Sequence, residues 1–104
     1  MERFKFLEDS RAIQEFQVLD FKSSQSGRYF KINIRLIDNS ILIAREFSSP
    51  KERNYSFHWM SNNKELITRW DNAPYHTQVK TFPHHKHEKD TINESHEITL
   101  EEVI

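Results

Sequence analysis

Apolar and polar residues alternate most regularly between positions 30 and 36 of the chain. The apolar members of this series are Phe30, Ile32, Ile34 and Leu36. A period of two predicts a β-strand with one buried face. Asp38 and Asn39 follow, and both residue types tolerate the left-handed backbone of a tight hairpin turn. Residues 41–47 then return as the second strand of a predicted hairpin.

A two-residue loop at positions 38–39 would fix the register of this hairpin. Ile34 would face Ile43 on the apolar side, and Lys31 would face Glu46 on the polar side. Hydrophobic burial and cross-strand charge agree in this register, so we expect it to be the one adopted.

A second hairpin is predicted from strands at 54–60 and 66–71, with a loop at 61–64. Its alternation places Trp59 and Trp70 on the apolar side, where we expect them in the core. If both hairpins join one sheet, a polar face results that carries Lys31, Asn33, Glu46, Ser56, His58, Arg69 and Asp71.

The remaining segments give weaker signals. Residues 13–21 read as a first strand, and residues 1–11 as a short helix or an edge strand. Thr99-Leu100-Glu101-Glu102 has the form of a capping box and predicts a terminal helix, whereas the polar residues 88–97 are expected to be mobile. We therefore predict a single α+β domain over residues 1–104, with a twisted antiparallel sheet of about four to six strands. The N-terminal segment and the C-terminal helix would cover its apolar face, and a homodimer would be another way to bury that face.

Composition narrows the possible functions. The chain has 15 basic and 16 acidic residues and a formal net charge of −1, which argues against binding nucleic acid through a strong general field but allows a local basic face. It has no cysteine, which excludes disulfides and Cys-ligated zinc. It also has no apolar run near the ~20 residues of a membrane span and no signal peptide. We expect a cytoplasmic protein without a cofactor.

Residues 55–87 hold five of the six histidines and both tryptophans. Imidazole titrates near neutral pH, so this segment is suited to acid/base chemistry. Asp71 could orient an imidazole, and Arg69 could stabilise charge on a phosphate. A metal-independent ribonuclease needs this inventory, with catalytic candidates His58, Arg69, Asp71, His76 and His85.

Other readings of the same residues stay open. The solvent-facing side of an antiparallel sheet is normally polar, and Arg69 and Asp71 could simply pair with each other. The spacing His85-x-His87 would put two imidazoles on one side of a strand, where His58, His76, Glu46 or Asp71 could complete a metal site; in a loop the spacing has no such meaning. A binding protein without catalysis and a metal-dependent hydrolase are therefore the alternatives.

Four sequence blocks, at residues 42–47, 55–59, 69–76 and 81–87, resemble the TumE family of small prokaryotic toxins, as does the tail at 98–104. The resemblance covers roughly Ile41 to the C-terminus. It departs at Phe57 and Tyr75, where Tyr and His would be expected, so His76 is a better candidate for chemistry than position 75. The positions carried over from the family's blocks are Glu46, Tyr55, His58, Arg69, Asp71, Asn72, His76, His84, His85 and His87.

The resemblance implies a toxin of a type II toxin–antitoxin system, with a small antitoxin, often of the helix-turn-helix class, as its partner. RNA as the target is an analogy with other small toxins of such systems. Exposed aromatic rings could stack on unpaired bases. The substrate-binding candidates are Lys31, Glu46, Tyr55, Asn72, Tyr75, His84, Lys86 and His87.

Overall fold

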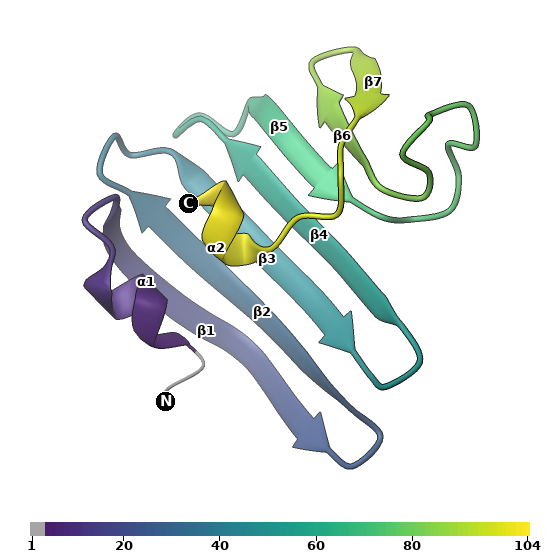
Figure 1. Cartoon of the computed structure of the whole chain (residues 1–104). Coiled ribbons are helices and arrows are strands. Elements are labelled where there is room, and N and C mark those ends of the chain that lie inside the picture. Colours follow the sequence, from purple (N-terminus) through teal and green to yellow (C-terminus); the bar gives the residue numbers. More distant parts are fainter. Residues whose placement is uncertain (1–3) are drawn as a thin grey trace.

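The computed structural model describes residues 4–104, which form one antiparallel sheet of seven strands and two short helices (Figure 1). The strands lie in the sheet in their order along the chain. The elements are α1 Lys5–Asp9, β1 Ile13–Ser24, β2 Gly27–Leu36, β3 Ile41–Ser48, β4 Arg53–Met60, β5 Leu66–Asp71, β6 His85–Glu88, β7 Thr91–Glu94 and α2 Leu100–Val103. The predicted α+β class is confirmed, but the sheet has seven strands instead of four to six. Positions 1–3 of the predicted N-terminal element lie outside the described residues.

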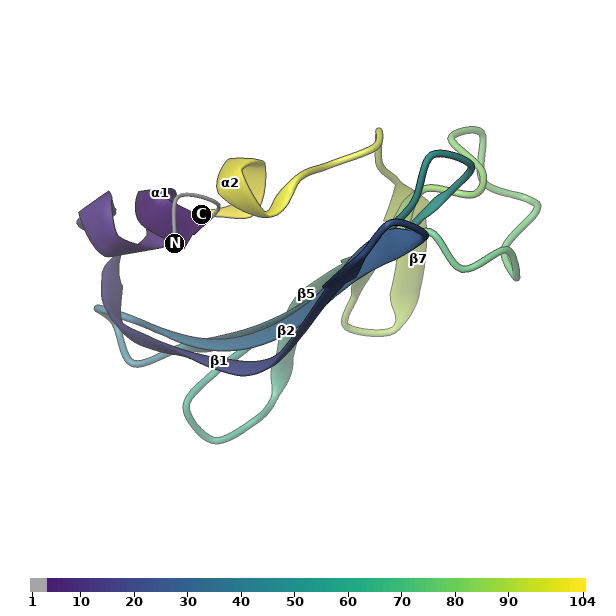
Figure 2. The ribbon, with the colours of Figure 1, turned by 90° about the horizontal axis from the view of Figure 1, so that it is seen from below.

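Both helices lie over the same face of the sheet, here called the covered face (Figure 2). Leu7 of α1 and Leu100 of α2 are buried against sheet residues such as Ile32 and Phe57, which are both fully buried. The prediction that the two chain ends cover the apolar face is confirmed. Thr99 caps α2: its side chain accepts from the backbone N–H of Glu102, whose own side chain accepts from the N–H of Thr99, as the capping box predicted.

The register of the first hairpin differs by one residue from the prediction. Ile34 faces Leu42, not Ile43, because the loop has three residues, Ile37 to Asn39. Asn39 adopts the left-handed backbone with φ 70°, which is the usual geometry of a three-residue hairpin loop. Because side chains alternate along a strand, a shift of one residue moves every β3 side chain to the other face. Leu42 and Ala44 therefore line the core, and Ile43 does not.

The facing of the second hairpin is as predicted. Phe57 faces Trp70 on the covered face, and His58 faces Arg69 on the opposite face. Both Trp59 and Trp70 are half-buried against the core. A register shift between Trp59 and Met60 leaves this arrangement of the central pairs unchanged.

The polar segment after position 84 contains a third hairpin that the sequence did not predict. Strands β6 and β7 pair from His85↔Glu94 to Glu88↔Thr91, with Lys89 in the left-handed region at the turn. The prediction of a mobile stretch at 88–97 is therefore wrong for β7. Strand β6 pairs with β5, which brings the histidines of β6 beside Arg69 and Asp71.

Neither helix within residues 4–104 has the length and apolar character needed to cross a membrane.

Candidate functional site: a histidine–arginine–aspartate cluster on the open face

The face opposite α1 and α2, here called the open face, carries two rows of side chains that run across the strands. The register gives the first row as Asn33, Ile43, His58, Arg69 and His87. The second row is Lys31, Arg45, Ser56, Asp71 and His85. Neighbouring strands lie about 4.8 Å apart, so consecutive members of a row are in reach of one another.

Arg69 lies between two histidines in the first row. Its Nε donates to Oδ2 of Asp71 at 3.1 Å, and its Nη1 lies 3.4 Å from Nδ1 of His58. A guanidinium only donates hydrogen bonds. In this contact Nδ1 of neutral His58 is therefore the acceptor, and the ring hydrogen is on Nε2. The Arg69 side chain is 42% exposed, and its contacts leave donors free for an anion.

Asp71 joins this pair to the histidines of β6. Its Oδ1 lies 2.8 Å from Nε2 of His85, and its Oδ2 lies 3.5 Å from Nε2 of His87. Nδ1 of His85 donates to the carbonyl oxygen of Pro83 at 2.8 Å, since a carbonyl only accepts. The rings of His85 and His87 point at each other, with their Nε2 atoms 3.1 Å apart.

His76 completes the group from the segment between β5 and β6. Its ring centroid lies 4.7 Å from that of His85 and 5.4 Å from that of His87. His76, His85 and His87 each offer one ring nitrogen within 4.8 Å of the others, which makes them possible metal ligands. The structure thus brings together all five catalytic candidates of the sequence, His58, Arg69, Asp71, His76 and His85, and adds His87.

Burial and charge shift the pKa of two members of this cluster. Burial, and then the charge of Arg69, lower the pKa of His58 below its ordinary value. Burial also lowers the pKa of His87, against the opposing charge of Asp71. Both imidazoles are therefore more fully neutral near neutral pH than a histidine in water, which suits His58 to accept a proton, whereas the charge of Asp71 favours the protonated form of His87.

The corrected register places two cations side by side on the open face. Lys31 faces Arg45, where the sequence had predicted a pair with Glu46. Neither cation forms an ion pair with another residue of the described chain 4–104. Both line a shallow hollow with His58 and Arg69. Like charges directly opposite each other destabilise a sheet, and an anionic ligand would relieve this repulsion. Arg45 was missed because the predicted register turned it to the other face.

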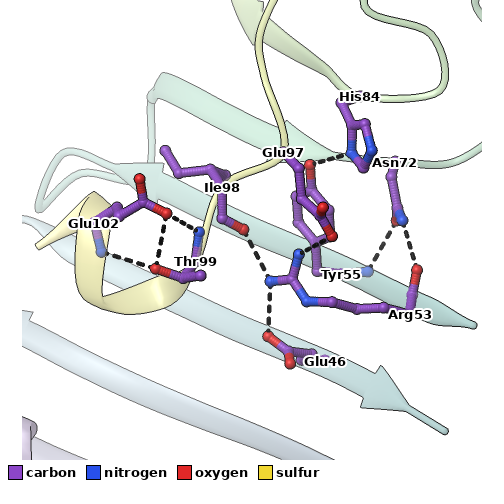
Figure 3. Close-up of polar contacts among 9 residues, drawn as sticks. All are labelled: Glu46, Arg53, Tyr55, Asn72, His84, Glu97, Ile98, Thr99 and Glu102. Carbon is purple, nitrogen blue, oxygen red and sulfur yellow. Dashed lines mark hydrogen bonds and ion pairs between the residues drawn. The ribbon is translucent and has the colours of Figure 1, made fainter. Parts of the chain in front are cut away.

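Two substrate-binding candidates lie instead on the covered face, around Arg53 (Figure 3). Glu46 accepts from Nη2 of Arg53 at 3.0 Å, so its predicted place on the polar face is wrong. Tyr55 is buried, its ring lies under the Arg53 guanidinium at 4.3 Å, and burial raises its pKa to about 12. Neither side chain faces the hollow, and the Tyr55 ring is not free to stack on a base.

Asn72 and His84 also serve this covered-face network. Asn72 accepts from the backbone N–H of Tyr55 at 2.9 Å and donates to the carbonyl of Arg53 at 2.6 Å, which ties the end of β5 to β4. His84 Nδ1 and the Tyr55 hydroxyl are 2.8 Å apart, and the two rings stack. Asn72 and His84, which the sequence analysis grouped with the substrate-binding candidates, therefore stabilise the covered face.

The last two candidates are separate from the cluster. Tyr75 is 80% exposed, so its ring is available to a ligand. Lys86 pairs with Glu88 at 3.6 Å and faces Trp70, on the side of β6 away from His85 and His87. Of the eight substrate-binding candidates, Lys31 and His87 are the two that lie with the catalytic ones.

A family model described as Toxin TumE matches residues 3–104 of the chain. No curated protein and no solved structure matches it. The family match covers the open-face cluster and the covered-face network alike.

Proposed function

Since the chain belongs to the TumE family of toxins, we propose that its open face cleaves RNA without a metal, by acid/base catalysis. Membership makes the protein a toxin of a toxin–antitoxin system, with an antitoxin as its partner. That the target is RNA, that the RNA is cleaved by transfer of its phosphate to the neighbouring 2′-hydroxyl and that the antitoxin is a helix-turn-helix protein are parts of the proposal.

The order His58–Arg69–His87 on three adjacent strands is the observation that carries this proposal. Two imidazoles flank one guanidinium, and the backbones of the outer two lie about 10 Å apart, twice the strand spacing. A phosphodiester bound at Arg69 would have an imidazole on each side of its phosphorus. Transfer of an RNA phosphate requires this placement, because one proton leaves the attacking oxygen and another joins the leaving oxygen.

In the proposed reaction the RNA 2′-hydroxyl oxygen attacks the adjacent phosphorus and the bond from phosphorus to the 5′-oxygen breaks. His58 takes the 2′-hydroxyl proton on Nδ1, the nitrogen that faces Arg69. His87 gives a proton to the departing 5′-oxygen, while Asp71 orients Arg69 and the β6 histidines. The products are a 2′,3′-cyclic phosphate and a 5′-hydroxyl. His85 is 1% exposed and contacts His87 and Asp71, so it is a positioning residue here.

The cations beside the site support an RNA strand as the ligand. Lys31 and Arg45 extend the positive surface from Arg69 across β3 to β2. Phosphates of neighbouring nucleotides would fit this local track, which the net charge of −1 does not prevent.

Cleavage of an end-labelled RNA oligonucleotide by the purified chain, in the presence of a chelator, tests this function. We expect fragments with cyclic phosphate ends, no cleavage of the 2′-deoxy substrate, and loss of cleavage in His58→Ala and Arg69→Ala. The exposed His96 and Arg28 lie outside the cluster, so His96→Ala and Arg28→Ala are matched controls that should cleave normally.

Growth arrest of cells with intact RNA would contradict the ribonuclease proposal. A protein that binds its target without cleaving it would then be favoured, since the cations of the open face would still bind an anionic partner. Arrest that persists in a folded His58→Ala, Arg69→Ala double variant would exclude the proposed chemistry.

A further inference from the structure

His76, His85 and His87 form a compact group whose size is close to that of a metal coordination sphere. Their three ring nitrogens lie within 4.8 Å of one another, and the Asp71 carboxylate contacts the two histidines of β6. The proposed cleavage reaction uses only His87 directly and gives His76 no step. Three imidazoles and a carboxylate are also a donor set typical of zinc and similar ions.

The contacts of His85 require either a proton or a metal ion beside its Nε2. Its Nδ1 carries the hydrogen that Pro83 accepts, so Nε2 of the neutral ring is a lone-pair nitrogen. This Nε2 lies 2.8 Å from Oδ1 of Asp71 and 3.1 Å from Nε2 of His87. Atoms that all bear lone pairs repel one another at such distances unless a proton or a metal ion lies between them.

The distances match a metal ion as well as a proton. Ligand atoms bound tetrahedrally to zinc at about 2.0–2.1 Å lie about 3.3 Å apart. The three contacts among Asp71, His85 and His87 measure 2.8, 3.1 and 3.5 Å. His76 is the outer member, and it comes from a segment without helix or strand, which allows the movement of about 1.5 Å that closing a separation of up to 4.8 Å requires.

We propose that Asp71, His76, His85 and His87 bind one divalent transition-metal ion of the zinc class, in a four-coordinate site with three nitrogens and one oxygen. The site is partly prepared by the fold. Strand β6 places His85 and His87 on one face, and the hydrogen bond from His85 to Pro83 fixes which ring nitrogen points inward. Such outer contacts orient metal-bound histidines in general.

Metal binding and proton donation by His87 exclude each other, because both use the same nitrogen. This consequence rests on the proposed function, whereas the binding site itself does not. The bound ion is therefore an inhibitor of RNA cleavage, and removing it with a chelator restores the activity.

Titration of the untagged, chelator-treated chain with Co²⁺ tests the site directly. We expect one ion per chain, with the strong visible absorption of four-coordinate cobalt, and displacement of cobalt by Zn²⁺. His76→Gln and His87→Gln should each weaken the apparent affinity at least about tenfold, while the exposed His96→Gln should leave it unchanged. Circular dichroism of each variant shows whether it folds.

Absence of one-to-one binding would overturn the metal site and leave the ribonuclease proposal standing. The same conclusion follows if His96→Gln weakens binding as much as His87→Gln does, since the ion would then bind adventitiously. The cleavage assay separates the two proposals. Inhibition by Zn²⁺ that a chelator reverses supports both of them. Cleavage that the chelator abolishes supports the metal site and overturns metal-independent cleavage.

Discussion

The two faces of the β4–β5 hairpin use the same residue type, arginine, for different purposes. On the covered face Arg53 donates to Glu46 at 3.0 Å, to Glu97 at 3.1 Å and to the carbonyl of Ile98 at 2.8 Å (Figure 3). On the open face Arg69 has one carboxylate partner, Asp71, and one long contact to His58. An arginine whose donors are occupied within the protein holds the fold together, and one with free donors is available to a ligand.

The comparison also explains why residue type alone did not distinguish structural residues from candidate site residues. Each face brings together an arginine, a histidine and a carboxylate, which are Arg53, His84 and Glu46 in the covered-face network and Arg69, His58 and Asp71 on the open face. All of them except Arg53 lie in blocks that resemble the TumE family. The difference lies in how many partners each group has, and the register and the loops decide that. Substitutions that affect one face without the other therefore test the comparison.

The largest effect is expected from a core side chain on the covered face. Phe57 is fully buried, so Phe57→Ala should lower the free energy of unfolding by about 3–5 kcal/mol. Urea denaturation followed by tryptophan fluorescence measures this loss. The next residue along the strand, His58, points to the open face, and His58→Ala should cost much less. Equal losses for the two variants would contradict the assignment of the faces.

Arg69→Ala should reduce the rate of RNA cleavage by about 10²–10³, the usual effect of losing one group that stabilises transition-state charge. Its unfolding curve should stay close to that of the unaltered chain, because the buried Asp71 keeps its contacts with His85, His87 and the backbone N–H of Ala73. Arg69→Lys keeps the charge but loses the planar fork, so we expect an intermediate rate. Single-turnover kinetics on a defined RNA measures all three rates. A full rate in Arg69→Ala would remove arginine from the mechanism.

Arg53→Met should show the reverse pattern. The side chain of Glu46 is 19% exposed, and without its partner it would lose a charge-assisted hydrogen bond, at a cost of about 1–3 kcal/mol. The tail carrying Glu97 and Ile98 would lose its connection to β4 as well. The protein that remains folded should cleave RNA at the normal rate. Urea denaturation and the cleavage assay on one preparation measure both quantities, and unchanged stability with lost cleavage would move Arg53 into the site.

Alternation along the strands was sufficient to predict much of the candidate site. His58, Arg69 and Asp71 lie on the two strands of one hairpin, and the alternation of side chains along those strands was enough to place all three on one face. The capping box at Thr99 is equally local, and it predicted α2. Features that depend on alternation within a strand or on one capping motif could be read from the sequence.

The errors arose where the structure depends on a loop length or on a contact that leaves little trace in the pattern of apolar residues. The choice between a two-residue and a three-residue loop at Asn39 set the register of β3, and the attractive pair of Lys31 with Glu46 favoured the wrong choice. Strands β6 and β7 have four residues each and little apolar alternation, and Lys89, at their turn, is not a typical turn residue. The contact of His76 with β6 depends on an irregular segment, for which the sequence offered no signal.

The smallest effect concerns the proton affinity of His58 on the open face. Burial is the larger cause that lowers its pKa from 6.5, and the charge of Arg69 on β5 is the second. Arg45 on β3 and Lys31 on β2 are the other cations around the hollow, and no carboxylate lines it. NMR titration of the ring should therefore give a pKa below 6.5. Arg69→Gln should raise that pKa but leave it below the ordinary value, because the burial remains.

The same shift fixes the sign of the effect of pH on stability. The folded chain binds the His58 proton more weakly than the unfolded chain does, so the contribution of His58 is complete above pH 6.5 and is lost as the pH falls from there toward the lowered folded-state pKa. His58→Gln should flatten this part of the stability curve, measured by urea denaturation at several pH values. A raised pKa at His58 would mean that an anion already lies beside the ring, and the open face would then resemble the covered face in having its charges neutralised within the protein.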